Sequence, residues 1–266
     1  MKISNKVFVL TGAGNGIGRE LAIQLIIKGA RVAGIDLDKD GLAETQKMAE
    51  DGGKTFQPVV LNITDREAAN KLPQQVIDHF GSVDGLINNA GIIQKFVPVN
   101  ELSIEDAERV LDVNFNGTLY LIKAFLPIFL DRPEAHIVNV CSMGGFLPVP
   151  GQTIYGASKA AVKLLTEGLY AELKETNIRV TVVFPGAIAT NISSNSGLDI
   201  PEVGADTNYK PMPADKAASQ IISGIEKNAF RVLVGSDAKM LDMMYRFAPK
   251  FATNFITKKM KNLLNN

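Results

Sequence analysis

Short apolar runs alternate with longer amphipathic stretches along almost the whole chain. Seven runs have the length and β-branched content of buried strands, and they cover residues 7–10, 31–36, 55–61, 85–88, 136–140, 179–184 and 231–234. Between them, apolar positions recur with helical spacing over 17–28, 42–50, 66–79, 104–130, 153–174 and 214–227. Strands that are apolar on both faces and alternate with helices are typical of a parallel sheet covered by helices on both sides. We therefore predict an α/β fold, with one domain over residues 1–266 and a Rossmann-like, doubly wound sheet of about seven parallel strands flanked by helices.

Two segments depart from this alternation. Residues 191–213 are irregular and rich in Ser, Asn, Gly and Pro. A loop of that length in a compact domain is usually functional, often as a lid, so we predict a substrate loop there. Apolar residues then recur at three- and four-residue steps on both sides of Pro249, which predicts an amphipathic C-terminal helical extension over about 237–266 that includes Met240, Met244, Phe247, Phe251 and Phe255.

Composition narrows the class of protein. The chain has 266 residues, 46% of them hydrophobic, with 28 Lys and Arg against 28 Asp and Glu. The apolar share excludes disorder as the main state, and zero net charge argues against binding nucleic acid through its phosphates. The one cysteine and two histidines are too few for a Cys- or His-based metal centre, so we predict no metal site. Cys141, His79 and His136 receive no role, and Cys141 is expected to be buried.

Location and charge raise a further question. No apolar run approaches the roughly 20 residues that a membrane-spanning helix needs. The first strand begins so early that it leaves no room for a signal peptide, which predicts a cytoplasmic protein.

From residue 238 onward, six cations stand against one anion, a local charge of +5 that leaves −5 for the rest of the chain. This tail is either a helix packed on the body or on a partner subunit, or a basic amphipathic segment that makes a peripheral membrane contact or covers the pocket.

A glycine-rich turn follows the first strand and opens directly into a helix. The turn contains Gly12, Gly16 and Gly18. Glycines at this spacing allow close approach of the backbone to a pyrophosphate, and the helix N-terminus offers free N–H groups to the anion. Asp36 ends the second strand, at the distance along the chain where a carboxylate binds the adenosine ribose. That carboxylate would repel a 2′-phosphate, and neither Asn15 nor Leu37 offers a cation, which favours NAD over NADP.

A second group of polar residues indicates chemistry. Tyr155 and Lys159 are four residues apart on one predicted helix face, so the phenol and the ammonium can point into one site. Positive charge from the ammonium and from an oxidised nicotinamide would lower the pKa of Tyr155 and make it a general acid/base. Ser142 follows the fifth strand, and Asn114 lies inside a long helix, where asparagine is a poor helix former. Taken singly, Tyr155 and Lys159 could be a chance pair, Ser142 a turn residue or helix cap, and Asn114 a core amide. Their order along the chain indicates a catalytic site instead.

These motifs together resemble the short-chain dehydrogenase/reductase family. Thr11 and the glycines match its Thr-Gly-x-x-x-Gly-x-Gly pattern and residues 88–91 (Asn-Asn-Ala-Gly) its second signature, in a likeness that runs from Lys6 to Thr190. Asn62 stands where the family usually has an Asp beside the adenine. The cofactor-binding residues that the motifs and the resemblance imply are Gly12, Asn15, Gly16, Ile17, Gly18, Asp36, Leu37, Asn62, Ile63, Asn89, Ala90, Gly91, Tyr155, Lys159, Pro185, Gly186, Ile188 and Thr190.

The resemblance also implies catalytic roles and an assembly. Tyr155 would exchange a proton with the substrate oxygen and Ser142 would hold that oxygen in place. Lys159 would bind the nicotinamide ribose and tune Tyr155, while Asn114 would hold a water in the proton relay. In the family, helices equivalent to 104–130 and 153–174 pair across a two-fold axis, which implies a homodimer or homotetramer.

The substrate is inferred from weaker signals. Residues 143–150, which follow Ser142, are apolar and contain no Arg or Lys to hold a carboxylate or phosphate, so we expect a lipophilic secondary alcohol or ketone. An NADP-dependent ketone reductase, acting for example on an acyl-carrier thioester, is an alternative that Asp36 disfavours. A non-catalytic dinucleotide-sensing or scaffolding protein is the third reading, and the presence of both Tyr155 and Lys159 disfavours it.

Overall fold

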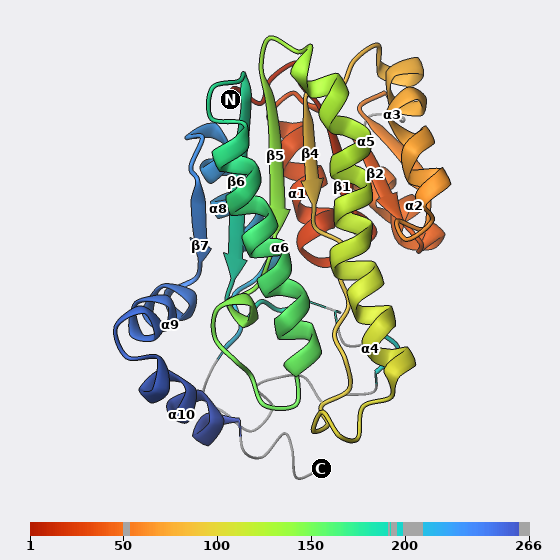
Figure 1. Ribbon diagram of the computed structural model, residues 1–266. Helices are drawn as coiled ribbons and strands as arrows, with labels where there is room; N and C mark the ends of the chain where they lie inside the picture. The colour runs from red at the N-terminus through yellow and green to blue at the C-terminus, as the bar shows by residue number, and fades with distance from the viewer. Residues whose placement is uncertain (50–53, 191, 193–195, 199–209, 261–266) are drawn as a thin grey trace.

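The computed structural model describes residues 1–49, 54–190, 192, 196–198 and 210–260. Its centre is one parallel sheet of seven strands in the order β3-β2-β1-β4-β5-β6-β7 (Figure 1). The strands are β1 (Val7–Thr11), β2 (Arg31–Asp36), β3 (Phe56–Val60), β4 (Gly85–Asn88), β5 (Ala135–Val140), β6 (Ile178–Pro185) and β7 (Arg231–Val234). The predicted strands agree with these bounds to about one residue, and the Rossmann-like parallel sheet is confirmed.

Helices cover both faces of the sheet. One face carries α1 (Gly16–Ile27), α2 (Lys39–Met48) and α8 (Ala214–Glu226), and the other carries α3 (Arg66–Phe80), α5 (Thr118–Leu130) and α6 (Thr153–Glu172) (Figure 1). Strand β1 shows why both faces must be covered. Phe8 and Leu10 belong to one apolar core and Val7 and Val9 to the other, because successive side chains of a strand point to opposite faces.

The strand order reverses between β1 and β4. The chain leaves β1 into α1 on one face, and it leaves β4 toward α4 (Ile104–Leu111) and α5 on the other. In open α/β sheets, ligands bind at the carboxyl ends of the strands at such a switch point. The glycine-rich turn follows β1 and Asn89 follows β4, so the topology brings both to this edge.

The predicted helix over residues 104–130 is not regular. It consists of α4, a π-helical turn η1 (Asp112–Gly117) and α5, and the hydroxyl of Thr118 donates to the carbonyl of Asn114 at 2.9 Å. Single π-helical turns inside α-helices are frequent at functional sites. By length and composition alone, Ile104–Leu130 is the one described helix that could span a membrane, contrary to our expectation of none. Its apolar side chains include Phe125 and Phe129, which are buried in the core against the sheet.

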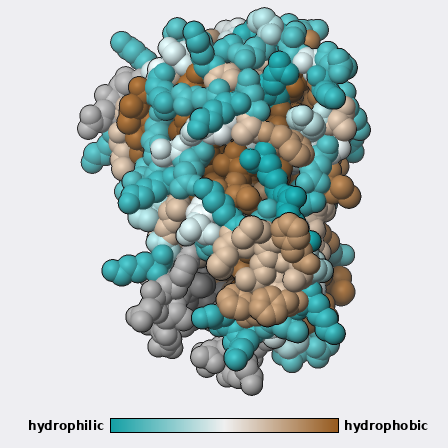
Figure 2. Space-filling model, turned by 90° about the vertical axis from the view of Figure 1, so that its left-hand side faces the viewer, coloured by the Kyte–Doolittle hydropathy of each residue, from teal (hydrophilic) through white to brown (hydrophobic). Residues whose placement is uncertain are grey.

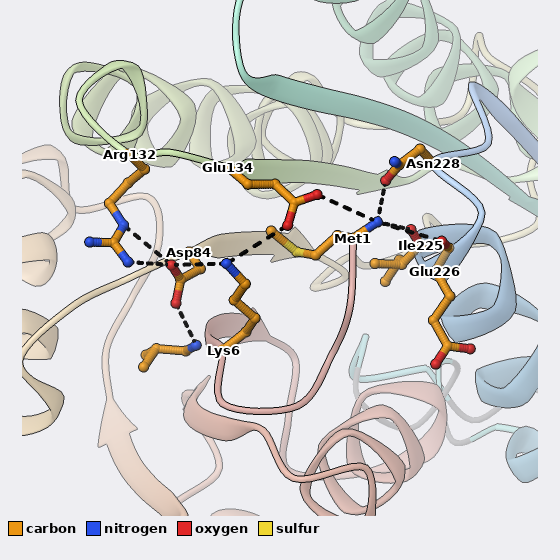
Figure 3. Close-up of polar contacts among 9 residues, drawn as sticks. Met1, Lys6, Asp84, Arg132, Glu134, Ile225, Glu226 and Asn228 are labelled. Carbon is orange, nitrogen blue, oxygen red and sulfur yellow. Dashed lines mark hydrogen bonds and ion pairs between the residues drawn. The ribbon is translucent and has the colours of Figure 1, made fainter.

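Ion pairs connect the strands at the opposite edge of the sheet, where the strands begin. Asp84, just before β4, is buried, accepts a hydrogen bond from the backbone of Val7 at 2.9 Å, and pairs with Arg132 at 2.6 Å (Figure 3). Lys6 lies between Asp84 and Glu134, at 3.8 and 3.7 Å. A buried carboxylate needs such partners. This network therefore ties β1, β4 and the start of β5 together at the end remote from the switch point.

The predicted C-terminal extension is a pair of helices, α9 (Ser236–Phe247) and α10 (Pro249–Lys259). Pro249 begins the second helix, a position where proline is well tolerated. One side of the pair is buried with Leu147 and consists of Leu241, Ala252 and Ile256. Most of the predicted substrate loop (191, 193–195 and 199–209) and the last residues of the tail (261–266) lie outside the described residues.

Candidate active site

The turn after β1 requires its glycines. Gly12 and Gly16 have φ angles of +69° and +52°, which side chains rarely adopt. A side chain at Gly18 would overlap the carbonyl oxygen of Gly12, and one at Gly14 would lie 2.9 Å from Asp36 Oδ2. Four positions of this turn, Gly12, Gly14, Gly16 and Gly18, therefore carry no side chain where the chain enters α1. A turn of this shape fits a pyrophosphate at the helix N-terminus.

Asp36 is fixed beside this turn. Its carboxylate accepts hydrogen bonds from the backbone N–H of Gly14 at 2.8 Å and of Asp38 at 3.1 Å. Arg19, which the sequence analysis did not weigh, lies at the same turn. Its guanidinium donates to Gly14 O at 3.1 Å and pairs with Glu44 at 2.6 Å. This cation is thus already engaged beside the carboxylate, while the neighbouring Leu37 is an exposed apolar side chain.

Thr11 joins the ends of β1 and β4. Its hydroxyl oxygen accepts hydrogen bonds from the backbone N–H groups of Asn89 and Ala90, each at 3.0 Å. The amide of Asn89 returns a hydrogen bond to Thr11 O at 3.0 Å. The two predicted signatures are therefore hydrogen-bonded to each other. A side chain at Gly12 would meet Asn89 Nδ2 at 2.8 Å, which explains the small residue there.

Asn114 connects three elements. Its Oδ1 accepts from Ile92 N at 2.9 Å, and its Nδ2 donates to Ile92 O and to Ser158 Oγ, each at 3.0 Å. It is fully buried in the π-helical turn η1. A Cβ atom on Gly91 would lie 3.1 Å from both Asn114 Oδ1 and Lys159 Nζ. The amide and the ammonium therefore lie together beside Gly91.

Ser142 and Tyr155 also come together. The Ser142 hydroxyl accepts from Gly144 N at 3.0 Å and so caps the short 3₁₀ turn η2 (Met143–Gly145). A Cβ atom on Gly144 would lie 3.4 Å from both Ser142 Oγ and the Tyr155 ring. A helix cap was the alternative reading of Ser142, and the structure combines it with proximity to the phenol. All four predicted catalytic residues thus lie around the start of α6.

Burial shifts the pKa values of both Tyr155 and Lys159. Burial raises the pKa of Tyr155 to about 12, against a smaller opposing effect of its hydrogen bond with Ser142. Loss of hydration therefore dominates the pKa of Tyr155 in this structure, and the lowering expected from the ammonium together with an oxidised nicotinamide stays a prediction. Burial also lowers the pKa of Lys159, whose Nζ donates to Val140 O at 3.1 Å.

Gln94 is a site residue that the sequence analysis missed. Its Oε1 accepts from the backbone N–H groups of Ile154 and Tyr155, at 2.8 and 2.9 Å, and thereby caps the first turn of α6. Gln152 Nε2 donates to Gln94 O at 2.7 Å, and both glutamines are buried. Gln94 Nε2 and Gln152 Oε1 have no hydrogen-bond partner among the described residues. No local pattern links Gln94 to a helix that begins far along the chain, so only the fold reveals this contact.

The segment after β6 crosses toward the glycine-rich turn. Gly186 N bonds to Val234 O at 2.9 Å and Ala187 N to Asp237 Oδ2 at 2.8 Å, so α9 braces its start. Ile188 pairs with Met212 in an isolated β-bridge, and a Cβ atom on Gly16 would lie 3.3 Å from Thr190 Cγ2. Pro185 is the last residue of β6, so the predicted nicotinamide segment runs from the sheet edge to the turn.

The other predicted residues lie nearby or at the sides. Asn62 is exposed, and its Oδ1 accepts from the backbone and hydroxyl of Thr64, at 3.1 and 2.9 Å. Leu61 N donates to Asp36 O at 3.1 Å, which places Asn62 at the same sheet edge as Asp36. Ile63 is buried against Gly117 of the π-helical turn. The remaining turn residues, Asn15 and Ile17, flank Gly16 at the start of α1.

Cys141 and His136 are buried, as expected for Cys141. The Cys141 thiol donates to Lys159 O at 2.9 Å, and burial raises its pKa to about 11. The His136 ring lies 2.8 Å from the hydroxyl of Thr181, which itself donates to Ala229 O. Within the described ranges, no group of three or more His, Cys, Asp or Glu side chains could hold a metal ion.

Comparison with known proteins agrees with this class of site. The model of the short chain dehydrogenases matches residues 6–200. The putative oxidoreductase SadH of Mycobacterium tuberculosis is 39% identical over 249 residues, which cover 91% of this chain and 90% of the relative. The 3-oxoacyl-acyl-carrier-protein reductase FabG of Thermotoga maritima is 35% identical over 213 residues, covering 80% and 85%. The chain therefore belongs to the short-chain dehydrogenase family and is an oxidoreductase.

Solved structures lead to the same family. A short-chain dehydrogenase/reductase of Burkholderia phymatum in complex with NAD has a TM-score of 0.83 at 25% identity, covering 93% of this chain and 96% of its own. A short-chain dehydrogenase of Burkholderia cenocepacia in complex with NADP has a TM-score of 0.80 at 28% identity, covering 96% and 99%. These two similar proteins hold different cofactors, so the likeness to them does not decide between NAD and NADP for this chain.

Proposed function

We propose that this oxidoreductase transfers a hydride between NAD(H) and a lipophilic secondary alcohol or the corresponding ketone. The observation that supports it best is the meeting of Asn114, Ser142, Tyr155 and Lys159 at the sheet edge that also carries the glycine-rich turn. The bound cofactor supplies the hydride acceptor or donor. The protein supplies the binding surface, the orientation of the substrate oxygen and the proton.

The residues around the turn fit the parts of NAD. The backbone from Gly12 to Gly18 would hold the pyrophosphate, with Asn15 and Ile17 at the helix start. Asp36 would accept hydrogen bonds from the adenosine ribose, and Ile188 and Thr190 would hold the carboxamide. Among the described residues at this turn, Asp36 offers a carboxylate and the Arg19 guanidinium is already paired with Glu44, which supports NAD over NADP.

Tyr155 carries the proton in this proposal. With its pKa raised to about 12, the phenol is protonated at neutral pH and can donate to a ketone oxygen held by Ser142. Oxidation of an alcohol needs the phenolate, which positive charge near the ring favours. Lys159, with Asn114 next to it at Gly91, would supply part of that charge. The proposal thus predicts that the acid/base group titrates at lower pH in the ternary complex than in the free chain.

The apolar character of the substrate is inferred from the residues after Ser142. Met143, Phe146 and Leu147 form an apolar cluster with the C-terminal helices. No Arg or Lys lies between residues 143 and 150 that could bind a carboxylate. This surface favours an apolar group on the carbinol carbon over a polyol.

A substrate and cofactor panel tests the proposal. Secondary alcohols of increasing chain length, aromatic carbinols and short polyols are compared at neutral pH with NAD and with NADP, by absorbance of the reduced cofactor. We expect kcat/KM to be about tenfold or more higher with NAD and to rise with apolar chain length. Preference for polyols would contradict the substrate class alone. Asp36→Ala should weaken the binding of NAD without changing which alcohol is preferred. The cofactor preference and the substrate class are therefore tested separately.

One relative supports a second candidate. The chain shares 35% identity with FabG of Thermotoga maritima, named as a 3-oxoacyl-acyl-carrier-protein reductase. An NADP-dependent ketone reductase would reduce a 3-oxoacyl thioester with NADPH faster than it reduces the free ketones that correspond to the alcohols of the panel.

We also propose that the chain assembles into a homodimer or homotetramer. Exposed apolar side chains lie on the helices that would pair, and they are Ile104, Leu130 and Leu164. Light scattering of the purified protein measures the oligomeric state.

A further inference from the structure

The outer side of the C-terminal helix pair is apolar and exposed. It consists of Met240, Met243, Phe247 and Phe251, and we call it the outer face. Phe247 is 86% exposed and Phe251 62% exposed. Figure 2 shows an apolar patch on this side of the molecule with hydrophilic side chains around it. Monomeric proteins rarely present several large apolar side chains together without a partner.

The helix pair also has a separate, buried apolar side, so the outer face is not needed to pack these helices on the protein. The inner side of the same helices is buried against Leu147 through Leu241, Ala252 and Ile256. Met244 and Phe255 pack at the edge of this cluster. The pair therefore has two apolar sides, one used inside the protein and one directed away from it.

The charges around the outer face have one sign. In the described part of the two helices the carboxylates are Asp237, which accepts from Ala187 N at 2.8 Å, and Asp242, which pairs with Arg231 and Arg246 at 2.6 and 3.0 Å. Asp237 is thus engaged by the backbone of the segment after β6, and Asp242 by two arginines. No ion pair of Lys239, Lys250, Lys258 or Lys259 is found among the described residues. The exposed residues of the pair present apolar rings next to cations.

We propose that the outer face docks on an anionic lipid bilayer. Phe247 and Phe251 would enter the interface between headgroups and acyl chains, and the lysines would contact the headgroup phosphates and carboxylates. A symmetric contact between two copies would bring cations of one outer face, such as Lys239 and Lys250, against the same set of cations on the other, so like charges disfavour that occupant. Charge complementarity therefore selects the lipid surface.

Docking there would orient the catalytic edge of the sheet. The helix pair lies beyond the carboxyl ends of the strands (Figure 1). Asp237 braces the start of the segment after β6, and the inner side contacts η2 directly after Ser142. The bilayer would thus lie on the same side of the molecule as the candidate active site. The docking proposal does not depend on the proposed function, because its readout is binding and not turnover.

Vesicle cosedimentation tests the proposal on the full chain. Vesicles of phosphatidylcholine alone are compared with vesicles that contain about one-third phosphatidylglycerol, at low and at high salt. We expect at least about tenfold stronger binding to the anionic vesicles at low salt, and loss of most of that gain at high salt. The double variant Phe247→Ser/Phe251→Ser should lower binding about tenfold or more to anionic vesicles.

Matched variants separate the contributions. Lys239→Gln/Lys250→Gln should remove most of the preference for anionic lipid, whereas Lys47→Gln/Lys71→Gln, at exposed lysines elsewhere, should not. Ile27→Ser/Met48→Ser removes exposed apolar side chains outside the patch and should leave binding unchanged. Thermal unfolding verifies that each variant is folded. Absence of vesicle binding, or equal binding by the Phe247→Ser/Phe251→Ser protein, would overturn the proposal. So would a fall in oligomeric mass of that variant without lipid, because the outer face would then be a contact between copies.

Discussion

The catalytic edge of the sheet and the C-terminal helix pair are held in place in different ways. At the catalytic edge, side-chain hydrogen bonds position the residues, as with Asn114 between Ile92 and Ser158 and Gln94 at the start of α6. The helix pair is positioned mainly by apolar packing around Leu147 and by two aspartates. Hydrogen bonds are directional and apolar contacts are not. A chemical role can therefore be inferred for the first region from residue types, while the second shows only which surfaces are buried and which are free.

Removing the phenol tests the catalytic edge most severely. We expect Tyr155→Phe to lower kcat by about 10²–10⁴, since that is the usual contribution of a positioned proton donor. Cofactor affinity, measured by fluorescence titration, should change little. Tyr170→Phe is the matched control on the same helix, because Tyr170 packs on Phe230 away from the site. A Tyr155→Phe enzyme that keeps more than about a tenth of its kcat would contradict the role of this phenol.

Gln94 tests whether the helix cap serves catalysis. Gln94→Leu leaves two partly buried N–H groups at the start of α6 without their acceptor, which costs about 1–3 kcal/mol of unfolding free energy. Without this cap the first turn of α6 should shift and displace Tyr155. We therefore expect kcat to fall by about ten- to a hundredfold, with a smaller change in KM. Gln94→Glu keeps an acceptor and should restore most of kcat.

The pH–rate profile distinguishes positioning from mere stability for Gln94. A positioning role shifts the pKa of the acid/base group in Gln94→Leu, because the phenol then sits in a different environment. A lowered melting temperature with an unshifted profile and unchanged kcat would limit Gln94 to a structural role.

His136 tests the sheet beneath both regions. Burial is the main reason why the pKa of His136 falls from 6.5 to about 3 in the folded chain. A lowered folded pKa means that the unfolded chain binds the proton more readily, so stability is present above pH 6.5 and is lost as the pH falls toward 3. At pH 5 we expect a loss of about 2 kcal/mol.

Chemical denaturation between pH 7 and 5 measures the effect of His136. His136→Gln should flatten this dependence, since an amide does not titrate. His79→Gln, at an exposed ring, serves as the control. An identical pH dependence in the wild type and in His136→Gln would exclude His136 as its origin.

The smallest effect is expected at the base of the helix pair. Asp242→Asn removes the charge that pairs with Arg231 and Arg246. The isosteric amide keeps an oxygen acceptor for Arg231, which also keeps its contact with the Phe184 ring, 4.6 Å from the centroid, so we expect a loss of only about 1 kcal/mol. Turnover should stay within about twofold, because no catalytic hydrogen bond is lost. A large loss of turnover without loss of stability would mean that the helix pair acts on the site directly.

Much of the fold could be predicted because its signals are local. β1 is a continuous apolar run and ends at the glycine turn, so strand, turn and helix are all visible within a few residues. Asp36 is the last residue of β2 and Ser142 lies just after β5, and the ends of the strands in a parallel sheet share one edge. The irregularity at Asn114 was less visible, since a π-helical turn differs from an α-helix in its hydrogen bonds and not in its composition.

The sequence by itself determined the order of strands and helices, the glycine turn, and the residue types that meet at the catalytic edge, because each depends on neighbours along the chain. Only the tertiary structure decided that Gln94 caps α6, that burial raises the pKa of Tyr155, and that the C-terminal helices have a filled inner side and an apolar outer face. These properties depend on which distant segments exclude water from a group. Packing sets that exclusion, and a pattern along the chain does not record it.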